Sequence, residues 1–140
     1  MYEDVLTALA DAQVRFVVTG GVAVALHGHE RRVPDLDIVV DPSPPNLDAV
    51  MACLGRLGFR STLPLPLATL IVLRTLDTNG REVDINRIYA IAFDALLERA
   101  ATVSIEGRAV AIISRNDLIA VKQQRGRDYD LEDVRLLESA

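Results

Sequence analysis

The sequence has 140 residues, half of them apolar, which is enough for one domain with a single hydrophobic core. Its 20 acidic and 15 basic residues give a formal net charge of −5, which excludes binding of nucleic acid by overall positive charge. The single cysteine, Cys53, excludes an intramolecular disulfide framework and a zinc site with several cysteine ligands, and it indicates a reducing, cytoplasmic setting. Cys53 lies on a predicted apolar helix face, so we expect it in the core.

The N-terminal residues and the apolar stretches do not resemble export or membrane segments. Glu3, Asp4 and Asp11 interrupt the basic-then-apolar pattern of a signal peptide. The longest apolar stretch, residues 63–73, is broken by prolines and is shorter than the roughly 20 residues of a membrane-spanning helix. We therefore expect a soluble protein that does not bind membranes.

The chain begins with a predicted helix, a strand and a glycine turn. Apolar residues at helical spacing predict an amphipathic helix over residues 2–12. The β-branched and aromatic run at residues 16–18 predicts a strand, which ends at Gly20 and Gly21. Small residues follow the two glycines, so we expect a short helix to begin there.

Strands and helices alternate along the rest of the chain. In order, the predicted elements are a strand over residues 35–40, a helix over 47–57, strands over 69–76 and 82–88, a helix over 91–101, strands over 102–105 and 109–113, and two helices on either side of Gly126. The Asn79-Gly80 pair and residues 106–108 favour hairpins, and Ser114 followed by Asp117 is typical of a helix start. The predicted fold class is α/β (α+β), with a mixed sheet flanked by helices.

Asp35 and Asp37 begin a predicted strand and lie two residues apart, so both side chains project from one face of it. Two adjacent carboxylates repel each other unless a cation or a proton lies between them, and Mg²⁺ prefers such oxygen ligands. Taken alone, an Asp-x-Asp triplet more often caps a strand and faces solvent. Its interpretation as a metal site therefore depends on neighbouring residues.

Gly20 and Gly21 end one strand and open a helix shortly before this acidic pair. Residues without a Cβ allow a ligand close to the backbone, and the free N–H groups of a helix start favour anions such as phosphate. An ordinary strand-to-helix turn explains the same pair equally well.

A third acid, Asp84, lies within an apolar strand whose residues Val83 and Ile85 point to the opposite face. An acid in such a strand faces either water or a site. Three carboxylates carried on strands are what two-metal phosphoryl transfer requires.

Together, these residues resemble the polymerase-beta-type nucleotidyltransferase superfamily, and in particular its small prokaryotic members. The matching pieces are Gly20-Gly21, His27-Gly28, Arg31, Asp35-Leu36-Asp37, Asp84 and the tail at residues 117–137. The resemblance implies a nucleotidyltransferase-like fold, with residues 1–140 as a single domain.

The resemblance also implies roles for these residues. Asp35 and Asp37 are expected to bind two Mg²⁺ ions, while Asp84 binds the catalytic ion and helps to deprotonate the acceptor. Gly20 and Gly21 are expected to cradle the triphosphate of an NTP. Val33 departs from the family pattern, which often has threonine two residues before the first aspartate, so a hydroxyl contact is lost. This departure bears on catalytic efficiency and not on the metal ligands.

The segment before the acidic pair carries weaker signals. Arg31 and Arg32 offer planar donors to phosphate oxygens, and they fit equally well a solvated loop in which they pair with Glu30. His27 and His29 are the only histidines, so we expect structural roles for them and no zinc site.

Lys122 is the only lysine among the 15 basic residues, and it falls on the lysine position of the tail motif. An ammonium group on a flexible stem suits a phosphate, so we predict that Lys122 binds the nucleotide; a lysine on an exposed helix face is the alternative. The charged residues that follow alternate in sign, so we expect surface ion pairs and capping of the last helix. These residues are Arg125, Arg127, Asp128, Asp130 and Asp133.

The function predicted in this way is a Mg²⁺-dependent enzyme that transfers a nucleoside monophosphate from an NTP to an acceptor hydroxyl and releases pyrophosphate. The acceptor is open between tRNA, as in toxins of toxin–antitoxin pairs, and a small molecule, as in antibiotic-modifying enzymes. A chain of 140 residues has little room for an acceptor-binding domain, so a partner protein or a homodimer can complete the site. The alternative function is a nucleotide-binding or interaction module of the same fold with weak or no turnover.

Overall fold

The computed structural model describes residues 2–139, so Met1 and Ala140, the ends of the predicted 1–140 domain, lie outside it. In chain order, the elements are α1 (Glu3–Asp11), β1 (Phe16–Thr19), α2 (Gly20–Leu26), β2 (Asp35–Val40), α3 (Pro44–Arg56), β3 (Arg60–Ser61), the 3-10 turn η1 (Leu67–Thr69), β4 (Val72–Leu76), β5 (Glu82–Asn86), α4 (Phe93–Arg99), β6 (Ala101–Ile105), β7 (Arg108–Ile112), α5 (Arg115–Arg125) and α6 (Asp128–Glu138). Within the described range, no helix is long and apolar enough to cross a membrane.

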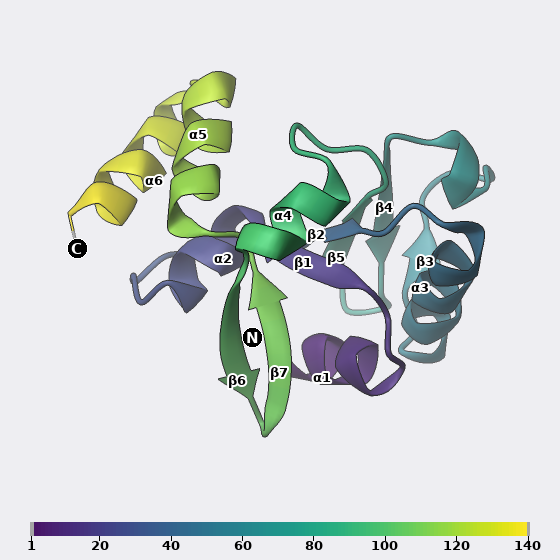
Figure 1. The fold of residues 1–140 in the computed structure, drawn as a ribbon. Helices are drawn as coiled ribbons and strands as arrows, with labels where there is room; N and C mark the ends of the chain where they lie inside the picture. The colour runs from purple at the N-terminus through teal and green to yellow at the C-terminus, as the bar shows by residue number, and fades with distance from the viewer. Residues whose placement is uncertain (1, 140) are drawn as a thin grey trace.

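The strands form one mixed sheet in the order β3-β4-β5-β2-β1-β7-β6 (Figure 1). β2 runs parallel to β5 and β1 runs parallel to β7, whereas all other neighbours pair antiparallel. The two predicted hairpins are β4–β5 and β6–β7. The prediction of a mixed sheet flanked by helices is therefore confirmed.

The core fixes the direction of the acidic side chains on β2 and β5. Leu36, Ile38, Val83 and Ile85 are fully buried, and each buried side chain of this size contributes about 1.5–3 kcal/mol. Because side chains alternate along a strand, the residues between them project from the other face of the sheet. α2 packs on β1 and β2, and α5 packs on α6, so these helices border that other face (Figure 1).

Most element boundaries differ from the predictions by one to three residues, and two of them have a clear structural cause. The strand expected over residues 69–76 begins at Val72, because the chain first makes the η1 turn. The helix expected over residues 91–101 ends at Arg99, because Ala101 already pairs within the β6–β7 hairpin. In both places strand pairing, rather than local residue preference, decides the boundary.

Candidate active site

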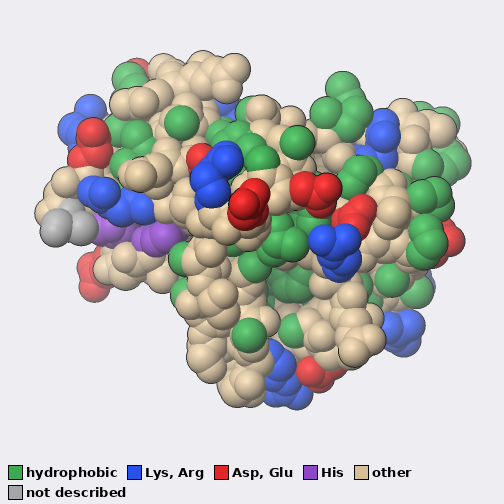
Figure 2. Space-filling view, in the orientation of Figure 1, with side chains coloured by type: hydrophobic (Ala, Val, Ile, Leu, Met, Phe, Trp, Pro, Cys, Tyr) green, Lys and Arg blue, Asp and Glu red, His purple; other side chains and the backbone are tan. Residues whose placement is uncertain are grey.

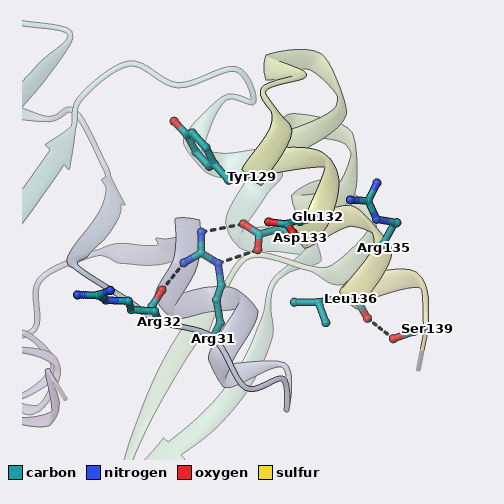
Figure 3. Close-up of a pocket in the computed structure, with 8 residues that line it drawn as sticks. All are labelled: Arg31, Arg32, Tyr129, Glu132, Asp133, Arg135, Leu136 and Ser139. Carbon is teal, nitrogen blue, oxygen red and sulfur yellow. Dashed lines mark hydrogen bonds and ion pairs between the residues drawn. The ribbon is translucent and has the colours of Figure 1, made fainter.

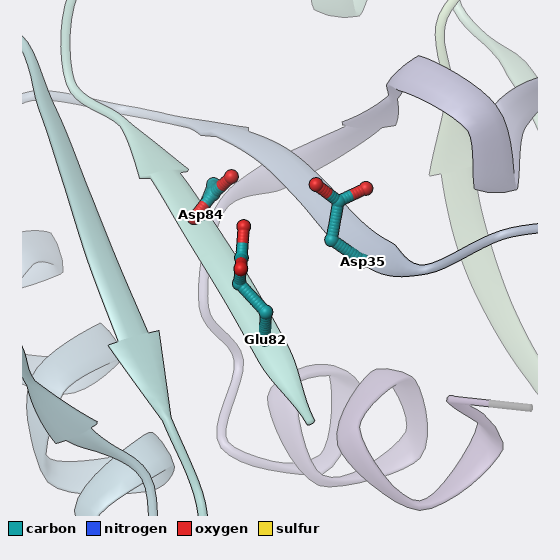
Figure 4. Close-up of side chains that lie close together, drawn as sticks. All are labelled: Asp35, Glu82 and Asp84. Carbon is teal, nitrogen blue, oxygen red and sulfur yellow. The ribbon is translucent and has the colours of Figure 1, made fainter. Parts of the chain in front are cut away.

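Carboxylates of β2 and β5 lie side by side on one face of the sheet. The parallel register places Asp35 opposite Glu82 and Asp37 opposite Asp84. One oxygen each of Asp35, Glu82 and Asp84 lies within 4.8 Å of the other two, as Figure 4 shows. This close group contains two of the three predicted acids, Asp35 and Asp84, together with Glu82, which the sequence analysis missed. The third predicted acid, Asp37, lies opposite Asp84 in the register but outside the close group. The available signal for Glu82 was its spacing of two residues from Asp84.

Burial and the charges of neighbouring acids raise the pKa values of Asp37 and Glu82. The pKa of Asp37 rises from 3.8 to about 6, first because the side chain is buried and then because Asp35 and Asp84 carry like charges. The pKa of Glu82 also rises, owing to burial, to a hydrogen bond with Asp84 and to the charge of that neighbour.

Arg74 compensates part of this charge. Its Nε lies 3.0 Å from Glu82 and 3.3 Å from Asp84, but its side chain is 59% exposed, so solvent screens the pairing. The remaining negative charge and the convergence of carboxylate oxygens fit a hard divalent cation such as Mg²⁺.

The glycine turn lies directly against the acids. Gly20 has a φ of +66°, and a Cβ at this position would lie 2.5 Å from Oδ2 of Asp37. Both the backbone conformation and the space therefore require glycine. A Cβ at Gly21 would lie 2.9 Å from Nη1 of Arg31, so the guanidinium group of Arg31 covers this side of the turn.

Tyr89 fixes the residue that precedes the turn, because its hydroxyl is hydrogen-bonded to Oγ1 of Thr19 at 2.7 Å. The guanidinium carbon of Arg125 lies 5.9 Å from the centre of the Tyr89 ring, and the charge of Arg125 acts to lower the pKa of Asp37. Arg125 therefore lies beside the turn. The sequence analysis missed Tyr89, and it assigned Arg125 to a surface ion pair that the described residues do not form.

A buried ion-pair network joins the loop before β2 to α5 and α6. Arg31 donates Nε and Nη2 to the two carboxylate oxygens of Asp133 at 2.7 and 2.9 Å. Nζ of Lys122 lies 2.8 Å from Asp133 and 3.7 Å from Asp130, and Nε of Arg127 lies 2.6 Å from Asp130. Asp130 and Asp133 are 0% and 3% exposed, so the expectation of surface ion pairs is wrong for these two residues.

The same contacts correct two alternatives for the basic residues. Lys122 is 3% exposed, so it does not lie on an exposed helix face. Arg31 pairs with Asp133 rather than with Glu30. Of the five N–H groups on the Arg31 guanidinium, Asp133 and the carbonyl of Arg32 take three, which leaves two for a ligand. The predicted capping of the last helix is present, since the backbone N–H of Arg127 donates to Asp130 at 3.3 Å.

A cavity of about 560 Å³ lies between the acids, the glycine turn and this network. Its lining includes all the residues predicted for the site, namely Asp35, Asp37, Asp84, Gly20, Gly21, Arg31 and Lys122. Arg32 and Arg125 line it as well, and neither forms an ion pair with a residue between positions 2 and 139. Figure 2 shows acidic side chains gathered near the middle of this face with basic ones beside them. Such a division of charge suits a polyphosphate bound together with a cation.

Residues near the site that the sequence analysis singled out pack as structural elements. Val33 is partly buried against the core, with Cγ1 at 3.4 Å from where a Cβ of Gly21 would lie. His27 holds the carbonyl of Ile113 through Nε2 at 2.8 Å, in line with its expected structural role. Cys53 is 2% exposed and lies in the core as predicted, and burial raises its pKa.

Solved structures share this fold at low sequence identity. The lincosamide antibiotic adenylyltransferase LnuA with bound lincomycin superposes with a TM-score of 0.74 at 17% identity, covering 97% of this chain and 93% of LnuA. ANT(2'')-Ia in complex with adenylyl-2''-tobramycin gives 0.65 at 17% identity, covering 95% and 83%. TM1012 from Thermotoga maritima gives 0.65 at 19% identity, covering 96% and 90%. At these identities the likeness shows a common fold.

Comparison at the sequence level gives the family. A search of curated proteins found no match. The profile of the family described as nucleotidyltransferases of unknown function, DUF6036, matches residues 3–138, which is nearly the whole chain. The protein therefore belongs to this nucleotidyltransferase family.

Proposed function

We propose that the protein transfers a nucleoside monophosphate from an NTP to an acceptor hydroxyl and releases pyrophosphate, with Mg²⁺ as cofactor. The observation that carries this proposal is one cavity with clustered carboxylates and unpaired guanidinium groups in a chain of this family. The acceptor oxygen forms a bond to the α-phosphorus while the bond from that phosphorus to the β-bridging oxygen breaks. Pyrophosphate leaves with the electron pair, and the hydroxyl proton passes to a carboxylate.

Asp35, Asp37 and Asp84 are the proposed metal ligands and catalytic residues. Two bound Mg²⁺ ions would supply Lewis-acid stabilisation of the charge on the transferred phosphoryl group. Asp84 lies at the side of the cavity where Arg74 and Glu82 border the acids, and we assign it as the acceptor of the hydroxyl proton. Burial and the charges of Asp35 and Asp84 disfavour the ionised form of Asp37, so its carboxylate gains stabilisation when a cation binds.

The opposite side of the cavity would hold the triphosphate. Gly20 and Gly21 allow phosphate oxygens to approach the backbone, and Arg31 keeps two N–H groups for them. Arg125 supplies a guanidinium group that no described carboxylate neutralises. Lys122 also lines the cavity. Its ammonium group is paired with Asp133 at 2.8 Å, so Lys122 would act on the phosphates from within the buried network.

For the acceptor, we propose a small cationic molecule rather than tRNA. Glu82 lies beside Asp35 and Asp84 but is not one of the proposed metal ligands, so its carboxylate is not used to hold Mg²⁺. Together with the net charge of −5, it favours a cationic acceptor over a nucleic acid backbone. LnuA and ANT(2'')-Ia, which share the fold, are named for small antibiotic acceptors, in agreement with this choice.

The test is transfer of label from α-labelled NTPs to hydroxyl-bearing cationic small molecules and, in parallel, to tRNA. We expect transfer that requires Mg²⁺, is lost in Asp37→Ala and is retained in Asp128→Ala, an exposed acid outside the cavity. NTP binding without any pyrophosphate release would favour the alternative of an inactive module. Full transfer by Asp37→Ala would overturn the assigned site.

A further inference from the structure

A second cavity, of about 570 Å³, opens beside the first one. It lies between the loop before β2, which carries Arg31 and Arg32, and the side of α6 that carries Tyr129 and Asp133 (Figure 3). Arg31, Arg32 and Tyr129 line both cavities. The two cavities are therefore adjacent, and these three side chains lie at the boundary between them.

Among the aromatic residues of the protein, Tyr129 is the most exposed to solvent. The sequence has three tyrosines, three phenylalanines and no tryptophan. Tyr2, Phe16, Phe59 and Phe93 are buried, and Tyr89 is partly buried. The Tyr129 side chain is 49% exposed, although a core or a helix contact would cover an aromatic ring in most folds.

The Tyr129 ring is held in place from one side. The guanidinium carbon of Arg127 lies 4.5 Å from the ring centre, at cation–π distance. Arg127 is itself fixed, because its Nε is bonded to the buried Asp130 at 2.6 Å. Arg127 thus holds the ring through a cation–π contact, while about half of the Tyr129 surface stays exposed.

Polar groups next to the ring can contact the edge of a flat ligand. Arg32 and Glu132 line the second cavity, are exposed and form no ion pair with any residue in the described range 2–139. A guanidinium group donates hydrogen bonds and a carboxylate accepts them. Together they match the mixed donors and acceptors on the edge of a nucleobase.

We propose that the second cavity holds the nucleoside part of the NTP, with its base stacked on Tyr129. This inference rests on the proposed function, which places the triphosphate beside Gly21 and Arg31. Because Arg31 borders both cavities, a nucleoside joined to a triphosphate beside Arg31 would lie next to the second cavity. The volume lies within the usual range of about 300–1,000 Å³ for small-molecule sites.

The acceptor fits this cavity less well than the nucleoside. The acceptor hydroxyl must itself reach the proposed base, Asp84, whereas the ribose separates a nucleobase from the reacting α-phosphorus. Asp84, Asp35 and Asp37 do not line the second cavity, so it suits the part of the nucleotide that lies away from the reaction. Nε of Arg74 lies 3.3 Å from Asp84, so an acceptor that enters beside Arg74 would reach the proposed base. The nucleoside and the acceptor are therefore assigned to different sides of the acidic cluster.

The test compares binding of Mg²⁺–NTP with binding of Mg²⁺–tripolyphosphate, which has the phosphate chain but no nucleoside. We expect the wild-type protein to bind the NTP roughly tenfold more tightly than tripolyphosphate, because stacking of a base on an aromatic ring has that strength. Tyr129→Ala is expected to lose this difference while its affinity for tripolyphosphate stays unchanged. Tyr129→Phe, which keeps the ring, is expected to retain it.

Leu131→Ala is the matched control, because Leu131 is an exposed apolar residue of the same helix that lines neither cavity. Wild-type affinity of Tyr129→Ala for NTP would overturn the inference, and so would an equal loss of affinity for NTP and tripolyphosphate. A change confined to the KM of the acceptor would overturn it as well. If the wild-type protein binds tripolyphosphate and NTP not at all, the proposed function itself fails.

Discussion

The carboxylate of Asp37 occupies the space in which a side chain at Gly20 would begin. A Cβ there would lie 2.5 Å from Oδ2 and 3.0 Å from Cβ of Asp37. The turn expected to hold phosphate and a proposed metal ligand are therefore packed against each other without an intervening side chain. A side chain at Gly20 would consequently displace Asp37, a proposed metal ligand.

Gly20→Ala tests this contact. We expect transfer to fall about 100-fold, because the Asp37 carboxylate must shift. The free energy of unfolding should fall by about 1–2 kcal/mol, because alanine is strained at positive φ. Gly58→Ala is the control, since Gly58 has a φ of +92° and no atom within 4 Å of its added Cβ. It should lose stability in urea denaturation and keep its activity, whereas full activity of Gly20→Ala would contradict the prediction.

Asp84→Asn and Glu82→Gln separate the proposed base from its neighbour. Asp84 lies opposite Asp37 and is 7% exposed, whereas Glu82 precedes it by two residues and lies opposite Asp35. Loss of the base should lower transfer by about 10²- to 10⁴-fold, and Glu82→Gln should have a much smaller effect. Rates measured at saturating NTP decide between them, and equal losses in both variants would give Glu82 a role as important as that of Asp84.

Asp37→Asn should change how the protein responds to Mg²⁺. Removal of one repelling charge is expected to raise the Tm of the metal-free protein, because burial and two acidic neighbours disfavour the charged form of Asp37. A ligand that binds the folded state raises Tm, so addition of Mg²⁺ should stabilise the wild-type protein. Asp37→Asn should show little of this increase. An equal increase in both proteins would exclude Asp37 as a ligand.

Asp133 is expected to make stability depend on acid pH. Burial alone would raise the pKa of Asp133, but its bonds to Arg31 and Lys122 lower the pKa below the ordinary value of 3.8. A carboxylate of this kind stabilises the fold at pH values above 3.8, and its contribution is lost as the pH falls through the lowered pKa.

Asp133→Asn should therefore lower the free energy of unfolding by about 3–5 kcal/mol near neutral pH, since it leaves buried cations without a partner. Its difference from the wild-type protein should shrink as the pH falls from 3.8 through the lowered pKa, because the wild-type carboxylate gains a proton first in the unfolded state and then in the folded state. Urea denaturation over a pH series measures this difference. Asp128→Asn, on the exposed side of the same helix, should behave like the wild-type protein throughout.

Arg125 is predicted to contact the triphosphate directly. Arg125→Ala should raise the KM for NTP about tenfold with a small change in kcat, because one charge-assisted hydrogen bond is lost. Arg125→Lys should recover part of the affinity, since an ammonium group keeps the charge but not the planar fork. Arg56→Ala, an exposed arginine at the end of α3, is the control. An unchanged KM in Arg125→Ala would contradict this role.

Local patterns were sufficient to predict much of the fold and part of the site. The glycine turn, the hairpin at Asn79-Gly80 and the common direction of Asp35 and Asp37 follow from backbone conformation and from the alternation of side chains along strands. Convergence with Asp84 was predicted through the family resemblance, and the parallel register of β2 with β5 supplies its physical basis.

Features that depend on long-range packing could not be predicted in this way. Glu82 joins the acids because β5 pairs in register with β2, and no local signal fixes that register. Asp130 and Asp133 have the spacing of exposed helix residues, yet Lys122 and Arg31 approach them from α5 and from a distant loop, and burial follows. The contact of Tyr89 with Thr19 likewise joins segments far apart in the chain.

The pairing of β2 with β5 also determines when the site can form during synthesis. The acids of β2 are made early, but they have no partners until β5 has been completed, and pairing across such a distance in the chain is slow. The ion pair of Arg31 forms later still, since its partner Asp133 lies in the last helix. A chain that ends after β5 would carry every proposed metal ligand together with Arg31 and Arg32, but it would lack Lys122, Arg125 and the carboxylate that holds Arg31. The proposed site is therefore complete only after α5 and α6 are in place.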